Sequence, residues 1–121
     1  MNKIKVAILG ATGTVGQRFI QLLENHPWFE ISELLASSRS AGKSYSDAVS
    51  WKLDSEIPNS VKNLIVKSED EIEKFTSQIA FSGLDASVAG DLEFRCANSG
   101  MAVVSNARNF RMEKEVPLLI P

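Results

Sequence analysis

The stretch that decides the fold is KIKVAILGATGTVG, residues 3–16. Its first half, Lys3–Leu9, is a short apolar run rich in β-branched residues, which is typical of a buried strand. The run ends at a turn with glycines at positions 10, 13 and 16. Apolar residues at helical spacing follow, namely Val15, Phe19, Leu22 and Leu23. These residues therefore predict a strand, a tight glycine turn and a helix that ends near Asn25.

A strand, a glycine turn and a helix in this order form the opening of a dinucleotide-binding unit. Gly10 would let the chain leave the strand in a conformation that side chains disfavour. Gly13 would let the backbone approach a pyrophosphate, and Gly16 would let the helix pack closely on the strand. The free N–H groups of the helix would then face the phosphates. The spacing is GxxGxxG and not the commoner GxGxxG, so a tight turn without a ligand is the alternative.

Composition places the chain among ordinary globular proteins. Its 121 residues are 44% hydrophobic and 23% charged, as expected for a single domain. The net charge of −2 gives no reason to expect nucleic acid, and no apolar run is long enough to span a membrane. A single cysteine excludes an internal disulfide and a cysteine-rich metal site, and His26 is the only histidine. We therefore expect a cytoplasmic protein that binds no metal.

A second strand is predicted at Glu30–Ala36, and the loop after it indicates which dinucleotide is bound. In an NAD site an Asp or Glu near the end of this strand binds the ribose 2′-hydroxyl. Here the loop reads SSRSAGKS from Ser37, with hydroxyls, Arg39 and Lys43 but no acid. A guanidinium and hydroxyls would bind a 2′-phosphate that a carboxylate would repel, so the loop favours NADP. A solvated polar loop is the alternative.

Further along the chain, strands alternate with helices. Apolar runs predict strands at Leu64–Val66, Ile79–Ser82, Met101–Ser105 and Val116–Pro121. Ser68 and Glu71 form a capping box, which predicts a short helix with Ile72 and Phe75 facing inward. A longer helix is predicted from about Ala86 to Asn98, with one face made of Val88, Leu92 and Cys96.

The alternation predicts an α/β fold: a Rossmann-like, doubly wound, mainly parallel sheet with helices on both faces. Residues 45–63 are irregular, and Trp51 and Leu53 could form a short strand or a packing segment. Ligands of such sheets bind beyond the carboxyl ends of the strands, so the loops there should share one edge. The predicted cofactor-binding residues are Gly10, Thr12, Gly13, Thr14, Val15, Gly16, Ser37, Ser38, Arg39, Ser40, Ser82, Gly83 and Leu84.

Four blocks of the sequence together resemble the aspartate-semialdehyde dehydrogenases of archaea and fungi. These blocks are residues 7–16, 37–43, 103–112 and 116–121. The resemblance runs along the whole chain but covers only the amino-terminal cofactor domain of such an enzyme. It implies that residues 1–121 are an NADP-binding Rossmann domain, cut off before the catalytic and dimerisation domain.

The resemblance also implies a reaction. The family reduces L-aspartyl-4-phosphate to L-aspartate 4-semialdehyde with NADPH, on the route to lysine, threonine and methionine. A cysteine thiolate displaces phosphate, and the resulting thioester accepts hydride. By this resemblance Asn106 and Arg111 would bind the substrate, Arg111 through its phosphate group, and the full-length enzyme would be a homo-oligomer.

The catalytic cysteine of the family lies beyond this chain, so the resemblance implies no catalytic residue within it. Cys96 does not match the catalytic motif and is interpreted as a helix-packing residue. We therefore expect this chain alone to bind the cofactor without turnover.

Two alternatives remain open. A reductase of a CoA thioester, such as malonyl-CoA reductase, would have a similar cofactor domain. A stand-alone NADP-binding module would fit the short length and the missing nucleophile, although an apolar sixth strand would then be an exposed edge. The residues after Pro121 would distinguish these alternatives.

Overall fold

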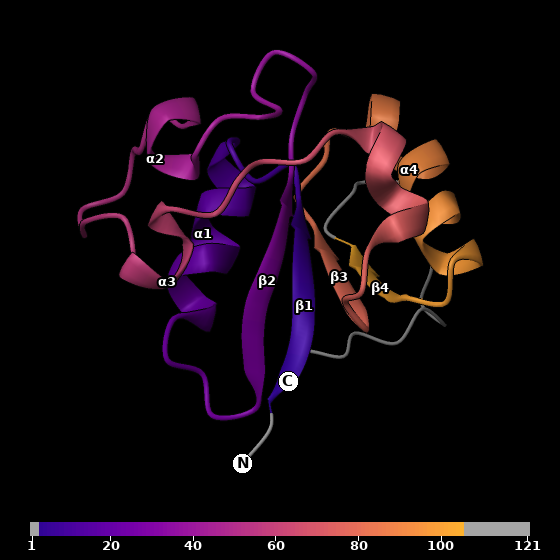
Figure 1. The fold of residues 1–121 in the computed structure, drawn as a ribbon, viewed down its shortest axis with the longest axis horizontal. Coiled ribbons are helices and arrows are strands. Elements are labelled where there is room, and N and C mark those ends of the chain that lie inside the picture. The colour runs from indigo at the N-terminus through magenta and orange to yellow at the C-terminus, as the bar shows by residue number, and fades with distance from the viewer. Residues whose placement is uncertain (1–2, 106–121) are drawn as a thin grey trace.

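The computed structural model describes residues 3–105, except the side chains of Ala86 and Ser87, and these residues form a four-stranded parallel sheet (Figure 1). The strand order is β2-β1-β3-β4, and all three pairings are parallel. The strands are β1 at Ile4–Leu9, β2 at Phe29–Leu35, β3 at Ile79–Ser82 and β4 at Ala102–Ser105. The predicted strand at 116–121 lies outside the described residues.

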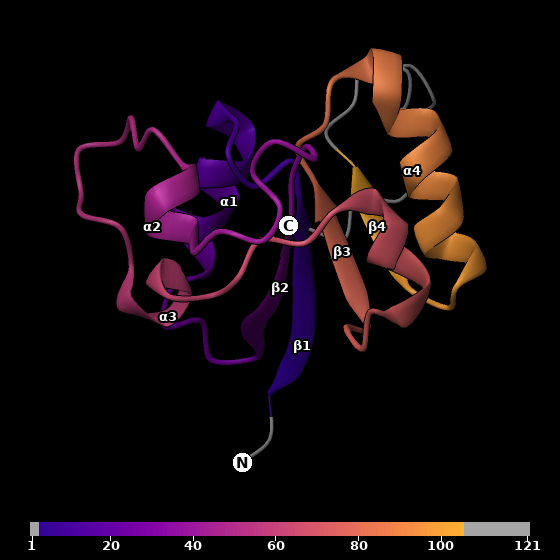
Figure 2. The same cartoon turned by 45° about the horizontal axis from the view of Figure 1, so that its top comes forward.

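Helices cover both faces of this sheet, as predicted (Figures 1 and 2). On one face lie α1, α2 and α3, which span Thr14–Leu23, Tyr45–Ala48 and Asn59–Lys62. On the other face lie the 3₁₀ helix η1 and the helix α4, which span Glu69–Lys74 and Ala86–Asn98. Within residues 3–105 no helix is both long and apolar enough to cross a membrane.

The central strand β1 supplies both hydrophobic cores. Val6 and Ile8 point to the face with α1, whereas Ala7 and Leu9 point to the face with α4, and all four are fully buried. Successive side chains of a strand face opposite sides, so a strand covered on both faces is apolar throughout. This is why residues 6–9 form an unbroken apolar run.

The predicted strand at Leu64–Val66 is wrong. Of these residues only Ile65 forms a bridge, an isolated antiparallel one with Ser44; Lys67, just beyond them, forms an isolated parallel one with Leu35 of β2. The N–H of Val66 donates to the carbonyl of Lys43, and the carbonyl of Val66 accepts from the N–H of Gly42, both at 2.8 Å. Because the loop after β2 occupies these backbone groups, the segment clips that loop and does not extend the sheet.

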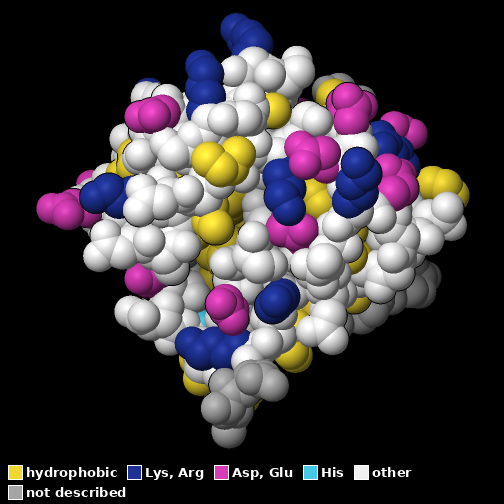
Figure 3. Space-filling model, in the orientation of Figure 1, with side chains coloured by type: hydrophobic (Ala, Val, Ile, Leu, Met, Phe, Trp, Pro, Cys, Tyr) yellow, Lys and Arg dark blue, Asp and Glu magenta, His cyan; other side chains and the backbone are white. Residues whose placement is uncertain are grey.

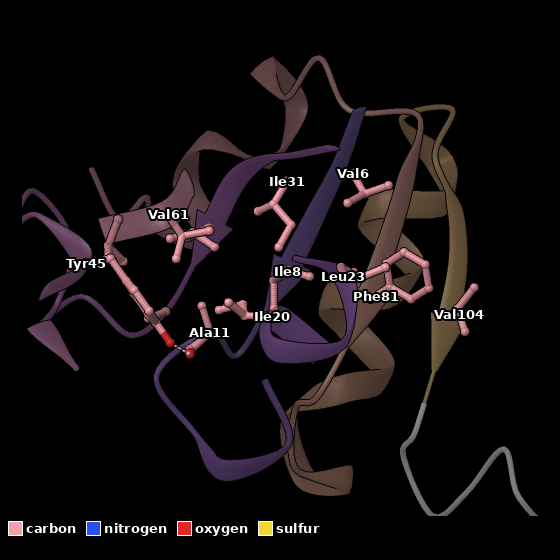
Figure 4. Close-up of a cluster of buried hydrophobic side chains, with 13 residues drawn as sticks. Val6, Ile8, Ala11, Ile20, Leu23, Ile31, Tyr45, Val61, Phe81 and Val104 are labelled. Atoms are coloured by element: carbon pink, nitrogen blue, oxygen red, sulfur yellow. Dashed lines mark hydrogen bonds between the residues drawn. The ribbon is translucent and has the colours of Figure 1, made fainter. Parts of the chain in front are cut away.

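The irregular residues 45–63 pack against α1 without forming a strand. Tyr45 and Val61 are fully buried and join the core beside Ile8 and Ile20 (Figure 4). Trp51 is half-buried and packs on the same cluster. The segment therefore extends the core beyond the edge of β2.

The buried faces of the two long helices differ from the sequence pattern. Val15, Leu22 and Val88 are 36%, 65% and 48% exposed. The buried residues of α1 are Gly16, Gln17, Ile20 and Leu23. In α4, Leu92 and Cys96 are buried as predicted, and Ala89 and Glu93 join them. Both helices are thus rotated so that Gly16 and Gln17 of α1, and Ala89 and Glu93 of α4, join the apolar residues that meet the sheet, while Val15, Leu22 and Val88 face outward.

The capping box is confirmed. The N–H of Ser68 donates to Oε2 of Glu71 at 3.2 Å, and η1 begins at the next residue. Ile72 in η1 is fully buried and Phe75 packs on the same core, as predicted.

On the outer surface, Arg95 of α4 binds Glu73 of η1 at 3.0 Å. Basic and acidic side chains are interspersed on the face shown in Figure 3.

A buried carboxylate ties β2 to the chain that enters β3. Glu33 is 4% exposed, and its oxygens accept hydrogen bonds from the N–H groups of Thr76 and Ser77 and from the Ser77 hydroxyl. The ammonium group of Lys67 lies 3.0 Å from Oε2. Burial alone would raise the pKa of Glu33, but these hydrogen bonds outweigh it and hold the pKa below its ordinary value of 4.5.

The Glu33 network should make folding stability depend on pH. Since the folded-state pKa is lowered, its stabilisation is complete above the ordinary value of 4.5 and is lost as the pH falls through the folded-state value. We expect Glu33→Gln to lower the free energy of unfolding by about 2 kcal/mol at neutral pH, because charge-assisted hydrogen bonds are lost. Urea unfolding at pH 7 and pH 3 measures the effect, and the loss should shrink at the lower pH.

Glu73→Gln is the matched control. Like Glu33, Glu73 has a lowered pKa, in its case because of Arg95, but the Glu73 side chain is 57% exposed. Its effect on stability should be much smaller, because water screens exposed pairs. Equal losses in the two variants, or a Glu33→Gln loss that does not change with pH, would contradict the role assigned to Glu33.

Candidate functional site

The predicted cofactor-binding residues follow the carboxyl ends of β1, β2 and β3, at the edge of the sheet that is at the top of Figure 1. The last residues of the four strands are in register: Leu9 pairs with Leu35 and with Ser82, and Ser82 pairs with Ser105. All strands are parallel, so the loops that leave them start side by side. The structure thus brings together the glycine turn, the loop from Ser37 and residues 82–84.

Gly10 begins the turn with a backbone φ of +73°, which favours glycine. The N–H groups of Gly10 and Ala11 both donate to the carbonyl of Leu35, at 2.9 Å each. These two bonds fasten the turn to the end of β2. The predicted conformational role of Gly10 is confirmed.

The start of α1 lies against the turn at a distance only glycine permits. A Cβ added to Gly16 would lie 2.2 Å from the carbonyl oxygen of Gly10, and one added to Gly83 would lie 2.8 Å from the nitrogen of Gly16. The close packing predicted for Gly16 is confirmed. Its partner is the turn itself and the chain leaving β3.

Gly13 differs from these two glycines. It precedes α1 with a φ of −82°, is exposed, and a Cβ added to it would meet only the carbonyl oxygen of Gly10 at 3.6 Å, an ordinary contact. Nothing in the described part of the chain therefore requires glycine at this position. A requirement for glycine here would come from a group that approaches from outside.

The amino-terminal end of α1 is suited to bind an anion. Thr14 and Val15 are exposed, and no hydrogen bond within residues 3–105 engages their backbone N–H groups. No side chain caps the helix, and its first turn contains no acidic residue. Free N–H groups and the positive end of the helix dipole favour a phosphate group at this position.

The loop after β2 presents the predicted specificity residues. Ser37, Ser38 and Arg39 are exposed, and Ser40 is half-buried. The N–H of Ser40 donates to the carbonyl of Ser37 at 2.9 Å, which folds the loop into a turn. The guanidinium group of Arg39 has no partner among residues 3–105, so it can receive an external anion.

Residues 82–84 contribute to the edge mainly through their backbone. Ser82 is fully buried, and its hydroxyl lies 3.4 Å from the N–H of Leu84, so the side chain has an internal partner. Gly83 packs on the glycine turn, as described above. Leu84 is half-buried and packs on the core beneath α4.

Cys96 is a packing residue, as predicted. Its side chain is fully buried in the core between α4 and the sheet. Burial, together with nearby Glu93, raises the pKa of the thiol to about 11. It therefore stays protonated at neutral pH and is a poor nucleophile.

The predicted substrate residues, Asn106 and Arg111, lie outside the described residues. The chain can be followed to Ser105 at the end of β4, where the Ser105 hydroxyl donates to Oε2 of Glu93 at 2.8 Å. Glu93 is 3% exposed, and the sequence pattern did not single it out.

Two residues that the sequence pattern did not single out hold the glycine turn from the side of the core. Tyr45 donates its hydroxyl to the carbonyl of Ala11 at 2.6 Å, and the Gln17 amide donates to the carbonyl of Thr12 at 3.0 Å. Gln17 lies three residues before the buried Ile20, on the same face of α1. A polar residue at this core spacing was the sequence signal that could have revealed a buried Gln17. No local signal marks Tyr45.

A depression of about 680 Å³ lies elsewhere, among residues at the amino-terminal ends of β1 and β2. Its lining includes Lys3, Lys5, Phe29 and Glu30. Parallel strands place these residues at the edge opposite to the glycine turn. The depression is therefore separate from the candidate site.

Comparisons with known proteins agree with this geometry. The family model described as semialdehyde dehydrogenase, NAD binding domain, matches residues 5–121. Aspartate-semialdehyde dehydrogenase of Saccharomyces cerevisiae is 56% identical over 94% of this chain and 31% of its own length. The enzyme of Methanothermobacter thermautotrophicus is 49% identical over 98% of this chain and 34% of its own length.

A solved structure of aspartate-semialdehyde dehydrogenase with NADP from Candida albicans has the same fold. It superposes with a TM-score of 0.86 at 52% identity and covers 96% of this chain and 33% of that one. The present chain thus spans about a third of the length of the relatives it matches. By its match to the family model and by its fold, the chain belongs to the semialdehyde dehydrogenase family and corresponds to its NAD-binding domain.

Proposed function

We propose that this chain is the NADP-binding domain of an aspartate-semialdehyde dehydrogenase. The observation that carries the proposal is the free amino-terminal end of α1, framed by the glycine turn and next in space to the loop with Arg39. About half of the residues are identical to those of fungal and archaeal enzymes with this activity. The solved relative from Candida albicans was determined with NADP.

Each part of the edge would hold one part of the cofactor. The N–H groups of Thr14 and Val15 would bind the pyrophosphate, and exposed Gly13 would leave room for it. Arg39 and Ser38 would bind the 2′-phosphate that distinguishes NADP from NAD. NADPH supplies the hydride for reduction, and these residues bind and orient it.

The full-length protein would convert L-aspartyl-4-phosphate to L-aspartate 4-semialdehyde and release phosphate. Since Cys96 is buried and protonated, the nucleophile would come from elsewhere in that protein. Asn106 and Arg111 would bind the substrate, and the 121 residues alone would bind NADPH without turnover. We further propose that the full-length protein is a cytoplasmic homo-oligomer.

A direct assay separates this activity from the alternatives. The full-length protein should reduce NADP when given aspartate semialdehyde and phosphate. Oxidation of NADPH with malonyl-CoA but not in the reverse aspartate-semialdehyde assay would favour a CoA-thioester reductase. Binding of NADPH without either activity would favour a stand-alone binding module.

Arg39→Ala tests the choice of cofactor. The variant should weaken NADPH binding by about 1.5–3 kcal/mol, because a charge-assisted hydrogen bond is lost, and should leave NADH binding nearly unchanged. Calorimetric titration with each dinucleotide measures both. Lys62→Ala removes an exposed charge from α3 and should change neither affinity. A wild-type protein with equal affinity for NADPH and NADH would refute the role of Arg39.

Gly13→Ala and Gly16→Ala should separate a ligand contact from a packing contact. Gly13→Ala should change stability by no more than about 1 kcal/mol, since its Cβ would make only an ordinary contact at 3.6 Å, yet weaken NADPH binding at least about tenfold. Gly16→Ala should lower stability by about 3 kcal/mol or more, because its Cβ would lie 2.2 Å from a carbonyl oxygen. Urea unfolding and NADPH titration measure the two effects. Wild-type affinity in Gly13→Ala would show that no ligand approaches this position.

A further inference from the structure

Beneath the glycine turn, the side chain of Gln17 is 1% exposed and fully hydrogen-bonded. Its amide nitrogen donates to the carbonyls of Thr12 and Ser50, at 3.0 and 3.1 Å. Its amide oxygen accepts from the backbone N–H of Lys52 at 2.8 Å. Both donors and the acceptor are thus used, and the residue joins the turn to a segment more than thirty positions away.

Tyr45 holds the neighbouring peptide of the same turn. Its side chain is fully buried, and its hydroxyl donates to the carbonyl of Ala11 at 2.6 Å (Figure 4). The ring of Trp51 meets the Tyr45 ring edge-on, with centroids 6.4 Å apart. Burial raises the pKa of Tyr45, so the phenol remains a neutral donor.

These bonds set the direction of the turn's peptide groups. The N–H and C=O of a trans peptide point in opposite directions, and the described chain has no cis peptide. With the Ala11 carbonyl held by Tyr45, the N–H of Thr12 points away from the core, and no partner within residues 3–105 engages it. The carbonyl of Thr12 is likewise held by the Gln17 side chain, while the N–H of Gly13 in the same peptide donates to the carbonyl of Gly10 at 3.1 Å. The carbonyl oxygens of Ala11 and Thr12, which carry partial negative charge, are therefore turned toward the protein and away from a bound phosphate.

We propose that Gln17 and Tyr45 are positioning residues for the dinucleotide: they hold the carbonyls of Ala11 and Thr12 toward the protein, so that the free N–H of Thr12, with those at the start of α1, faces the pyrophosphate. This inference rests on the proposed cofactor function. It gives the segment 45–52 a role in binding, because that segment supplies Tyr45 and is fixed by Gln17.

Loss of the hydrogen bonds to the turn should change dinucleotide affinity in a way that loss of stability alone would not. The turn would serve the pyrophosphate, which NADPH and NADH share, so disturbing it should weaken both ligands by the same factor. Arg39→Ala should by contrast affect NADPH alone. A variant that is merely destabilised should bind both ligands normally at a temperature where it is folded.

The test uses the full-length protein with Gln17→Met and, as a second variant, Tyr45→Phe. Both changes keep the volume approximately and remove the hydrogen bonds to the turn. Each should raise the dissociation constants of NADPH and NADH about tenfold, measured by calorimetric titration. Hydrogen exchange at the Lys52 amide should become faster in Gln17→Met, which would show that its bond to the side chain is gone.

Ile72→Val is the matched control. Ile72 is fully buried on the opposite face of the sheet, so the change should cost some stability without reaching the turn. Its affinities for both dinucleotides should equal those of the wild type.

The outcomes separate this inference from the proposed function. A wild-type protein that binds neither dinucleotide would overturn the proposed function and this inference together. A wild-type protein that binds NADPH, beside folded Gln17→Met and Tyr45→Phe variants with unchanged affinities, would overturn the inference alone. A loss confined to NADPH would also overturn it, because the effect would then not lie at the pyrophosphate.

Discussion

The close approach of three glycines is the constraint on which the rest of the domain depends. A Cβ added to Gly16 or Gly83 would lie 2.2 or 2.8 Å from a backbone atom of Gly10 or Gly16, and one added to Gly10 would lie 3.2 Å from the backbone of Gly83. The contact joins the end of β1, the start of α1 and the chain leaving β3. Because α1 is fixed at this point, its rotation about its own axis is fixed as well. That rotation buries Gln17 and leaves Val15 and Leu22 at the surface.

Two of the buried polar side chains, Glu33 and Gln17, hold the connections between the elements of the sheet. Glu33 joins β2 to the residues before β3, and Gln17 joins the glycine turn to residues 50–52. Each is surrounded by donors or acceptors that use its polar atoms, so burying it does not leave hydrogen bonds unmade. The apolar strands supply cohesion, while these few polar side chains decide where the loops lie.

Local sequence signals were sufficient for much of this fold. The apolar runs predicted four of the strands, and the capping box marked the start of η1, which the structure confirms. Predictions failed where distant residues decide the outcome. Leu64–Val66 has strand-like composition, but its hydrogen bonds go to the loop at residues 42–45. Tyr45 could not be assigned to the turn, since its partner Ala11 lies 34 positions away, and the bonds of Gln17 to residues 50 and 52 are similarly distant in the sequence.

The clip between Val66 and the loop after β2 separates that loop into two parts. Its base is anchored by backbone bonds from Gly42 and Lys43 to Val66, which do not depend on side-chain identity. Its tip, residues 38 and 39, carries exposed side chains that take no part in that anchoring. The side chains at the tip can thus be replaced without breaking the hydrogen bonds that anchor the base of the loop. Substitutions at these two positions therefore leave the hydrogen bonds of the sheet and of the glycine turn unchanged, so the proposed selection between NADP and NAD could be altered there independently of the rest of the fold.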